Sequence, residues 1–103
     1  LIHNASSLGP VPMVPLAELS DRALSEVFEV NVLGPQRLTR AFLGGMRRLQ
    51  IGTIVTISSD AAVAHYPTWG AYGASKAALD HFVGVLNAEL RNTHMVLNMY
   101  AKF

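Results

Sequence analysis

Residues 53–60 of the chain read TIVTISSD. The first five are all β-branched, and such a short run after Gly52 is typical of a buried strand over residues 53–57. Apolar stretches at residues 1–5 and 96–100 predict two further strands. The intervening residues 58–70, which include Pro67, are expected to form a connecting loop.

Two helical patterns separate the predicted strands. The first runs from Ser20, a good N-cap, to Leu49, and the second runs from Ala71 to Arg91. Their apolar stripes are Leu24, Val27, Phe28 and Asn31 on the first, and Leu79, Phe82, Val83, Leu86 and Leu90 on the second. This alternation predicts an α/β layered fold, with parallel strands, right-handed crossovers and helices on both faces of the sheet.

Composition excludes several classes of protein. The chain has 103 residues, half of them apolar, a formal net charge of +1 and no cysteine. These values fit one small domain, exclude disulfides and thiol chemistry, and provide no basic field for nucleic acid. No apolar run is long enough to cross a membrane. A solvated helix face is expected for the basic residues Arg37, Arg40, Arg47 and Arg48, with a phosphate or nucleic-acid patch as the alternative.

The low charge and the start of the chain favour an internal piece of a larger protein. Charged residues make up 15% of the chain, against roughly 25% in an ordinary globular domain. The sequence starts with the apolar pair Leu1 and Ile2, and it lacks the basic segment that begins a signal peptide. We therefore expect the core of this chain to be incomplete.

Small and polar residues follow the first two predicted strands. They are Asn4, Ala5 and Ser6 after the first, and Ser58, Ser59 and Asp60 after the second. Ligands bind outside the carboxyl ends of strands in open parallel sheets, which makes these residues candidates for a binding site. Ordinary turn formation is the alternative, because Ser, Asn and Asp favour turns.

Tyr72 and Lys76 are four residues apart at the start of the second predicted helix, so their side chains share one face. A phenol is a weak acid at pH 7, and a neighbouring ammonium favours the phenolate form. Tyr72 could then act as a general acid or base on a ligand oxygen. The alternative is an amphipathic helix in which Tyr72 packs and Lys76 reaches solvent.

Asn31 places an amide on the apolar stripe of the first helix, where it must find hydrogen-bond partners. Pro35 has no N–H, so it cannot bond the carbonyl of Asn31, and it should kink the helix. The sequence therefore predicts a free main-chain carbonyl at Asn31 that could hold a water. A plain proline kink with a solvated carbonyl is the alternative.

Four segments, in this order, resemble motifs of the short-chain dehydrogenase/reductase family. HNAS at residues 3–6 resembles the Asn-Asn-Ala-Gly motif, and NVLG at residues 31–34 resembles the segment with the catalytic asparagine. IVTISS at residues 54–59 is similar to the strand that ends at the catalytic serine, and YGASK at residues 72–76 is similar to the Tyr-x-x-x-Lys signature. Ser59 precedes Tyr72 by thirteen residues, the family's usual separation, which favours it over Ser58. The branches most similar are bacterial members of uncertain substrate and, more loosely, sepiapterin- and benzil-reductase-like members.

The resemblance implies a Rossmann-type doubly wound parallel sheet, present here in part as about three strands and two long helices. Residues 1–103 would be the C-terminal-side catalytic portion of a single Rossmann-type domain, without the N-terminal half that binds the cofactor phosphates. The implied activity is reduction of a carbonyl or oxidation of an alcohol by hydride transfer, with NADP, which the similar branches favour, or NAD as cofactor. The implied location is cytoplasmic, with no membrane or nucleic-acid partner.

The resemblance also implies residue roles. Tyr72 would be the general acid or base, with Lys76 assisting it and binding the nicotinamide ribose. Ser59 would polarise the substrate oxygen, and Asn31 would link Lys76 to solvent through its carbonyl and a water. The implied cofactor-binding residues are Asn4, Ala5, Ser6, Ile57, Ser58, Tyr72 and Lys76, the implied substrate residues are Ser59, Asp60 and Trp69, and no metal site is implied.

The chain departs from the family pattern at several points. His3 and Ser6 replace two residues of the Asn-Asn-Ala-Gly motif, the glycine-rich phosphate loop is not in the chain, and residues 100–103 stand where the family usually has Pro-Gly. We therefore expect no turnover from this chain alone.

Two other functions stay open: an extended-family epimerase or dehydratase, and a non-catalytic association fragment. The resemblance implies a homo-oligomer through the helices at residues 21–49 and 71–91.

Overall fold

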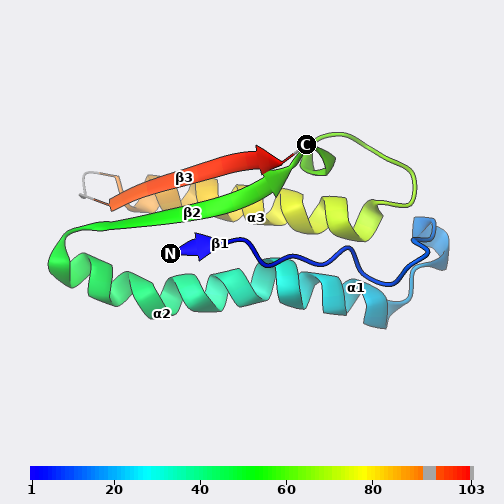
Figure 1. Cartoon of the computed structure of the whole chain (residues 1–103), viewed down its shortest axis with the longest axis horizontal. Coiled ribbons are helices and arrows are strands. Elements are labelled where there is room, and N and C mark those ends of the chain that lie inside the picture. Colours follow the sequence, from blue (N-terminus) through cyan, green and yellow to red (C-terminus); the bar gives the residue numbers. More distant parts are fainter. Residues whose placement is uncertain (92–94, 103) are drawn as a thin grey trace.

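The computed structural model describes residues 1–91 and 95–102. Its strands are parallel and form one sheet in the order β1-β2-β3, with helices in the connections (Figure 1). The elements are β1 (Ile2–His3), η1 (Leu16–Glu18), α1 (Asp21–Phe28), η2 (Glu29–Leu33), α2 (Gly34–Leu49), β2 (Gly52–Ser59), η3 (Asp60–Ala62), α3 (Gly70–Glu89) and β3 (Met95–Lys102). The predicted α/β class with parallel strands is confirmed.

The strand boundaries differ from the prediction. β1 has two residues where the sequence predicts five, because residues 4–6 leave the sheet directly after His3. β2 pairs with β3 from Gly52 opposite Met95 to Ser59 opposite Lys102. This continuous pairing brings Ser58 and Ser59 into β2, although the sequence assigns them to a loop, and it lengthens the third strand beyond residues 96–100.

The described helices cover one face of the sheet, where the sequence predicts helices on both. His3 and Ile54 line a small cavity together with Thr39 of α2 and Leu79 of α3, so both helices pack on that face. Ile2 points to the other face and is 68% exposed. Successive right-handed crossovers between neighbouring strands place both helices on the same side, which explains the difference.

The first predicted helix is interrupted around Asn31. Ser20 caps α1 as predicted, with its hydroxyl accepting a hydrogen bond from the backbone N–H of Ala23 (3.1 Å). Between α1 and α2 the chain forms η2, a π-helical turn that ends with the N–H of Gly34 donating to the carbonyl of Glu29. Pro35 has no N–H to continue the α-helical pattern, and a wider turn accommodates its ring. Such turns are frequent at functional sites.

The core between the helices and the sheet contains polar side chains. Val27, Asn31, Thr56 and Ser75 are the largest fully buried residues, and Leu79 and Leu90 of the predicted second stripe are also buried. Leu24 and Phe82, predicted to be on the apolar stripes, are 38% and 42% exposed. The second helix ends at Glu89, two residues earlier than predicted.

The prediction that the basic residues of α2 lie on a solvated helix face is confirmed. Arg37, Arg40, Arg47 and Arg48 are exposed. Arg37 forms an ion pair with Glu29, and this hydrogen bond lowers the pKa of the Glu29 carboxyl. None of the helices in the described ranges is long and apolar enough to span a bilayer.

Gly73 lets α3 approach η3 closely. A Cβ atom at this position would lie 2.7 Å from the carbonyl oxygen of Ala61, closer than van der Waals contact allows. Gly84, on the same helix, has open space around the corresponding position. The two glycines therefore form a matched pair for testing the packing.

Gly73→Ala should lower the free energy of unfolding by about 1–3 kcal/mol, because the backbone at Ala61 must shift. Gly84→Ala should raise it by about 0.5–1 kcal/mol through better helix propensity. Urea denaturation of the chain, followed by circular dichroism, measures both changes. Equal effects of the two substitutions would contradict the close approach of α3 and η3.

His3 is a buried imidazole whose Nε2 shares a 2.8 Å hydrogen bond with the hydroxyl of Thr39. Burial lowers the pKa of His3 below its ordinary value of 6.5. The folded state thus resists the proton that the unfolded state accepts. The contribution of neutral His3 to the free energy of unfolding should be fully present above pH 6.5. The free energy of unfolding should fall as the pH drops below that value.

His3→Gln should flatten the decline in the free energy of unfolding between about pH 6.5 and pH 5, because the buried titrating group is gone. His65→Gln removes an exposed imidazole and serves as the control. Urea denaturation across this pH range compares both variants with the wild type. An unchanged decline in His3→Gln would show that His3 does not resist protonation in the folded state.

Candidate active site

The candidate site lies at the carboxyl end of β2, where the chain passes into η3 beside the first turns of α3 (Figure 1). Two contacts attach α3 to this edge: the packing of Gly73 against Ala61, and a hydrogen bond from Lys76 to Ile57. The predicted residues Asn4, Ala5 and Ser6 follow β1 and are exposed. Ser58 and Ser59 are buried at the end of β2.

Lys76 is buried with its ammonium beside Tyr72. Its Nζ donates to the carbonyl oxygen of Ile57 at 3.0 Å and lies 5.7 Å from the centroid of the Tyr72 ring. The side chain is 3% exposed, so the alternative of a lysine that reaches solvent is wrong. A buried cation next to a phenol is an arrangement suited to proton transfer, because it stabilises negative charge on the phenol oxygen.

Asn31 is fully buried, and its amide connects two segments far apart in the sequence. Its Oδ1 accepts from the backbone N–H of Ser7 at 2.8 Å, and its Nδ2 donates to the carbonyl of Ser7 and the hydroxyl of Ser75, each at 2.9 Å. The hydroxyl of Ser75 in turn donates to the carbonyl of Tyr72 at 2.7 Å. The sequence predicts that the Asn31 amide needs hydrogen-bond partners, and the amide finds them within the protein.

Ser59 and Asp60 form a second polar cluster. The hydroxyl of Ser59 accepts from the N–H of Ala61 at 3.2 Å and donates to a carboxylate oxygen of Asp60 at 3.3 Å. The other oxygen of Asp60 accepts from the hydroxyl of Tyr66 at 2.6 Å. This last hydrogen bond raises the pKa of Tyr66, because it stabilises the protonated phenol.

Trp69 lies between two tyrosines. Its ring makes edge-to-face contacts with Tyr66, at 6.3 Å between centroids, and with Tyr72, at 5.7 Å. The contacts run from Asp60 through Tyr66 and Trp69 to Tyr72. They therefore join the loop after Ser59 to the start of α3 and hold the ring of Tyr72 from one side.

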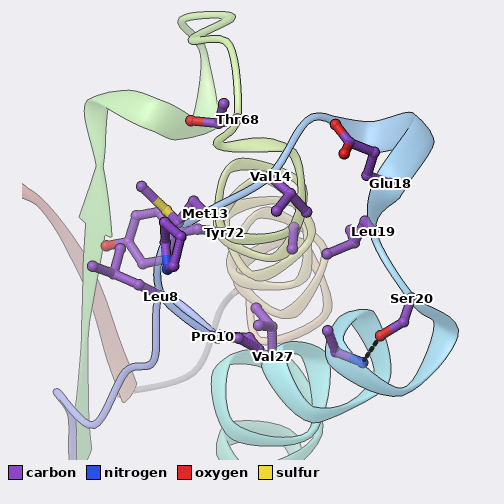
Figure 2. A pocket seen from close by; sticks show the side chains of 13 residues that line it. Leu8, Pro10, Met13, Val14, Glu18, Leu19, Ser20, Val27, Thr68 and Tyr72 are labelled. Carbon is purple, nitrogen blue, oxygen red and sulfur yellow. Dashed lines mark hydrogen bonds between the residues drawn. The ribbon is translucent and has the colours of Figure 1, made fainter.

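A cavity of about 160 Å³ lies behind the ring of Tyr72 (Figure 2). Its walls are mostly apolar and come from the segment of residues 8–20, from α1 and from the start of α3. Figure 2 shows the hydroxyl of Tyr72 pointing toward β2, on the side opposite Leu19 and Val27. The side chain of Tyr72 thus forms part of the cavity wall.

Three residues that build the site are not evident from sequence patterns. Ser75 lies between Tyr72 and Lys76, and their spacing gives it no role, although a serine inside a helix suggests a hydrogen bond of its own. Ser7 contributes backbone groups, which no side-chain pattern reveals. Tyr66 reaches Asp60 from a loop without periodicity. Across the described ranges, no group of acidic residues and histidines could hold a metal ion.

A family model described as short chain dehydrogenase matches residues 1–101. An uncharacterized oxidoreductase of Saccharomyces cerevisiae is 34% identical over 96 residues, which make up 93% of this chain and 37% of that protein. The structure is also similar to several solved structures that contain a nicotinamide cofactor, and two of them serve as examples.

One is a metagenomic short-chain oxidoreductase in complex with NADP, with a TM-score of 0.89 and 27% identity over 99% of this chain and 45% of that one. The other is 4-hydroxyisoleucine dehydrogenase complexed with NADH and succinate, with a TM-score of 0.86 and 28% identity over 95% of this chain and 45% of that one. The chain thus spans less than half the length of each of these proteins. Together with the Rossmann-type arrangement of its strands and helices, the family match shows that the chain belongs to the short-chain dehydrogenase/reductase family of oxidoreductases.

Proposed function

We propose that this chain carries the catalytic residues of a nicotinamide-dependent oxidoreductase that reduces a carbonyl or oxidises an alcohol. The observation that carries the proposal is the buried ammonium of Lys76, held by the carbonyl of Ile57 against the ring of Tyr72. Residues 1–103 make up the catalytic portion of a single Rossmann-type domain.

In the direction of reduction, Tyr72 donates its phenolic proton to the oxygen of the substrate carbonyl. Lys76 stabilises the negative charge that remains on the phenol oxygen, and Asn31 connects Lys76 to solvent through its main-chain carbonyl and a water. In the reverse direction, the phenolate of Tyr72 removes the proton of the alcohol. A nicotinamide cofactor held at this edge of the sheet would supply or accept the hydride at the substrate carbon.

The residues at the strand ends fit a nicotinamide cofactor in position and chemistry. Asn4, Ala5 and Ser6 are exposed at the edge where ligands of parallel sheets bind, and they bring small side chains and polar groups for a ribose. Ile57 and Ser58 lie at the end of β2, and Lys76 brings a cation beside them. We propose NADP as the preferred cofactor, because the family branches that the sequence resembles favour it, and NAD as the alternative. Solved relatives contain one or the other.

The substrate is a small carbonyl or alcohol bordered by Ser59, Asp60 and Trp69. The hydroxyl of Ser59 donates to Asp60 in this structure. To polarise a carbonyl oxygen, it must turn from Asp60 toward the substrate. The other carboxylate oxygen of Asp60 accepts a hydrogen bond from the hydroxyl of Tyr66.

Association through the helices is a second candidate function. Large apolar side chains of α2 and α3 are exposed, with Leu38 at 48%, Phe42 at 52%, Phe82 at 42% and Val85 at 45%. An exposed apolar surface of this kind marks a contact with another protein surface. A homo-oligomer through these helices is compatible with catalysis, whereas an association fragment would have no need of the Tyr72 hydroxyl.

Tyr72→Phe should lower kcat at least about 100-fold, because the proton donor is lost while the ring is retained. The assay uses the complete protein as its own gene encodes it, with NADPH or NADH and a range of ketones and aldehydes. Sedimentation of the same variant should show the wild-type oligomeric state. A variant with wild-type kcat would contradict the catalytic role of Tyr72 and favour the association function.

A further inference from the structure

Ser75 has a buried hydroxyl with two strong partners on different segments. The residue is fully buried, and its hydroxyl accepts from Nδ2 of Asn31 at 2.9 Å and donates to the carbonyl of Tyr72 at 2.7 Å. The direction of both bonds is fixed, because an amide Nδ2 only donates and a carbonyl only accepts. The hydroxyl therefore joins Asn31 to the main chain of Tyr72.

These bonds continue into a network that spans three segments. Asn31 in η2 holds both backbone groups of Ser7, which follows the exposed residues 4–6 after β1. Through Ser75 the same amide holds the first turn of α3. The position of Tyr72 is thus linked to the segment proposed to contact the cofactor and to the π-helical turn.

A role in helix stability alone does not account for this arrangement. Alanine is a better helix former than serine, and a serine that bonds back to its own helix gives the helix no gain. In contrast, loss of the hydroxyl would leave one N–H of the Asn31 amide without an acceptor in a buried position, which is costly. The hydroxyl matters because it joins segments.

We propose that Ser75 is a positioning residue for Tyr72, setting the first turn of α3 against Asn31 through the two hydrogen bonds of its hydroxyl. The effect on turnover rests on the proposed function, in which Tyr72 transfers the proton. Without the link, Tyr72 keeps its hydroxyl and its neighbour Lys76, but its alignment with the substrate is relaxed. Proton transfer then slows, while cofactor binding changes little.

Trp69 provides a test that does not depend on activity. It is the single tryptophan of the chain, and its ring contacts that of Tyr72. Ser75→Ala should change the near-ultraviolet circular dichroism and the fluorescence of Trp69, because the Tyr72 ring moves against it. Ser25→Ala is the matched control, since Ser25 is exposed on α1 and should leave both signals unchanged. Alanine is smaller and favours helix, so the variant should fold.

Turnover provides the second test, in the complete protein as its gene encodes it. Ser75→Ala should lower kcat by roughly tenfold, which corresponds to about 1.4 kcal/mol of barrier. The dissociation constant for NADPH, measured by cofactor fluorescence, should stay within about twofold of the wild-type value. A residue with only a structural role would not produce this separation of kcat from cofactor binding.

The outcomes are distinct. A changed Trp69 signal together with a lower kcat supports the proposal. A wild-type Trp69 signal overturns it, and so does a changed signal with an unchanged kcat. If the wild-type protein reduces no carbonyl, the proposed function fails, and the Trp69 signal still decides whether Ser75 positions Tyr72.

Discussion

The amide of Asn31 is the interaction on which the arrangement of the site depends. It is fully buried and makes three hydrogen bonds, two to the backbone of Ser7 and one to Ser75. A buried polar group left without a partner costs about 1–3 kcal/mol, a large share of the roughly 5–15 kcal/mol that stabilises a domain. The segment after β1, the π-helical turn and α3 therefore hold one another in register through a single side chain.

The second constraint is the close approach of α3 to the end of β2. Gly73 allows helix backbone to pass Ala61, and Lys76 reaches the carbonyl of Ile57 from the next turn. Together these contacts bring Tyr72, Lys76 and the end of β2 to one edge of the sheet. Parallel strands point their carboxyl ends to this edge, which is why the polar residues after each strand gather there.

The sequence predicts the order of elements, the parallel sheet and most of the candidate residues. Helical spacing alone places Tyr72 and Lys76 on one face, and Pro35 correctly marks the place where the helix is interrupted. It does not predict that Ser58 and Ser59 belong to β2, because that pairing depends on a partner strand far along the chain. The bonds of Asn31 to Ser7 are equally hidden, since they use backbone groups, and the aromatic contacts of Trp69 come from a loop without a period. Sequence patterns encode local geometry, whereas these features arise from packing between distant segments.

The central claim is that Tyr72, with Lys76 beside it, supports hydride transfer between a nicotinamide and a carbonyl carbon. The most direct measurement incubates the complete protein with NADPH or NADH deuterated at the reactive carbon of the nicotinamide, in the presence of ketones and aldehydes, and analyses the products by mass spectrometry. The account predicts alcohols that carry one deuterium on the former carbonyl carbon. A folded protein that binds the nicotinamide and yields no deuterated alcohol would contradict it.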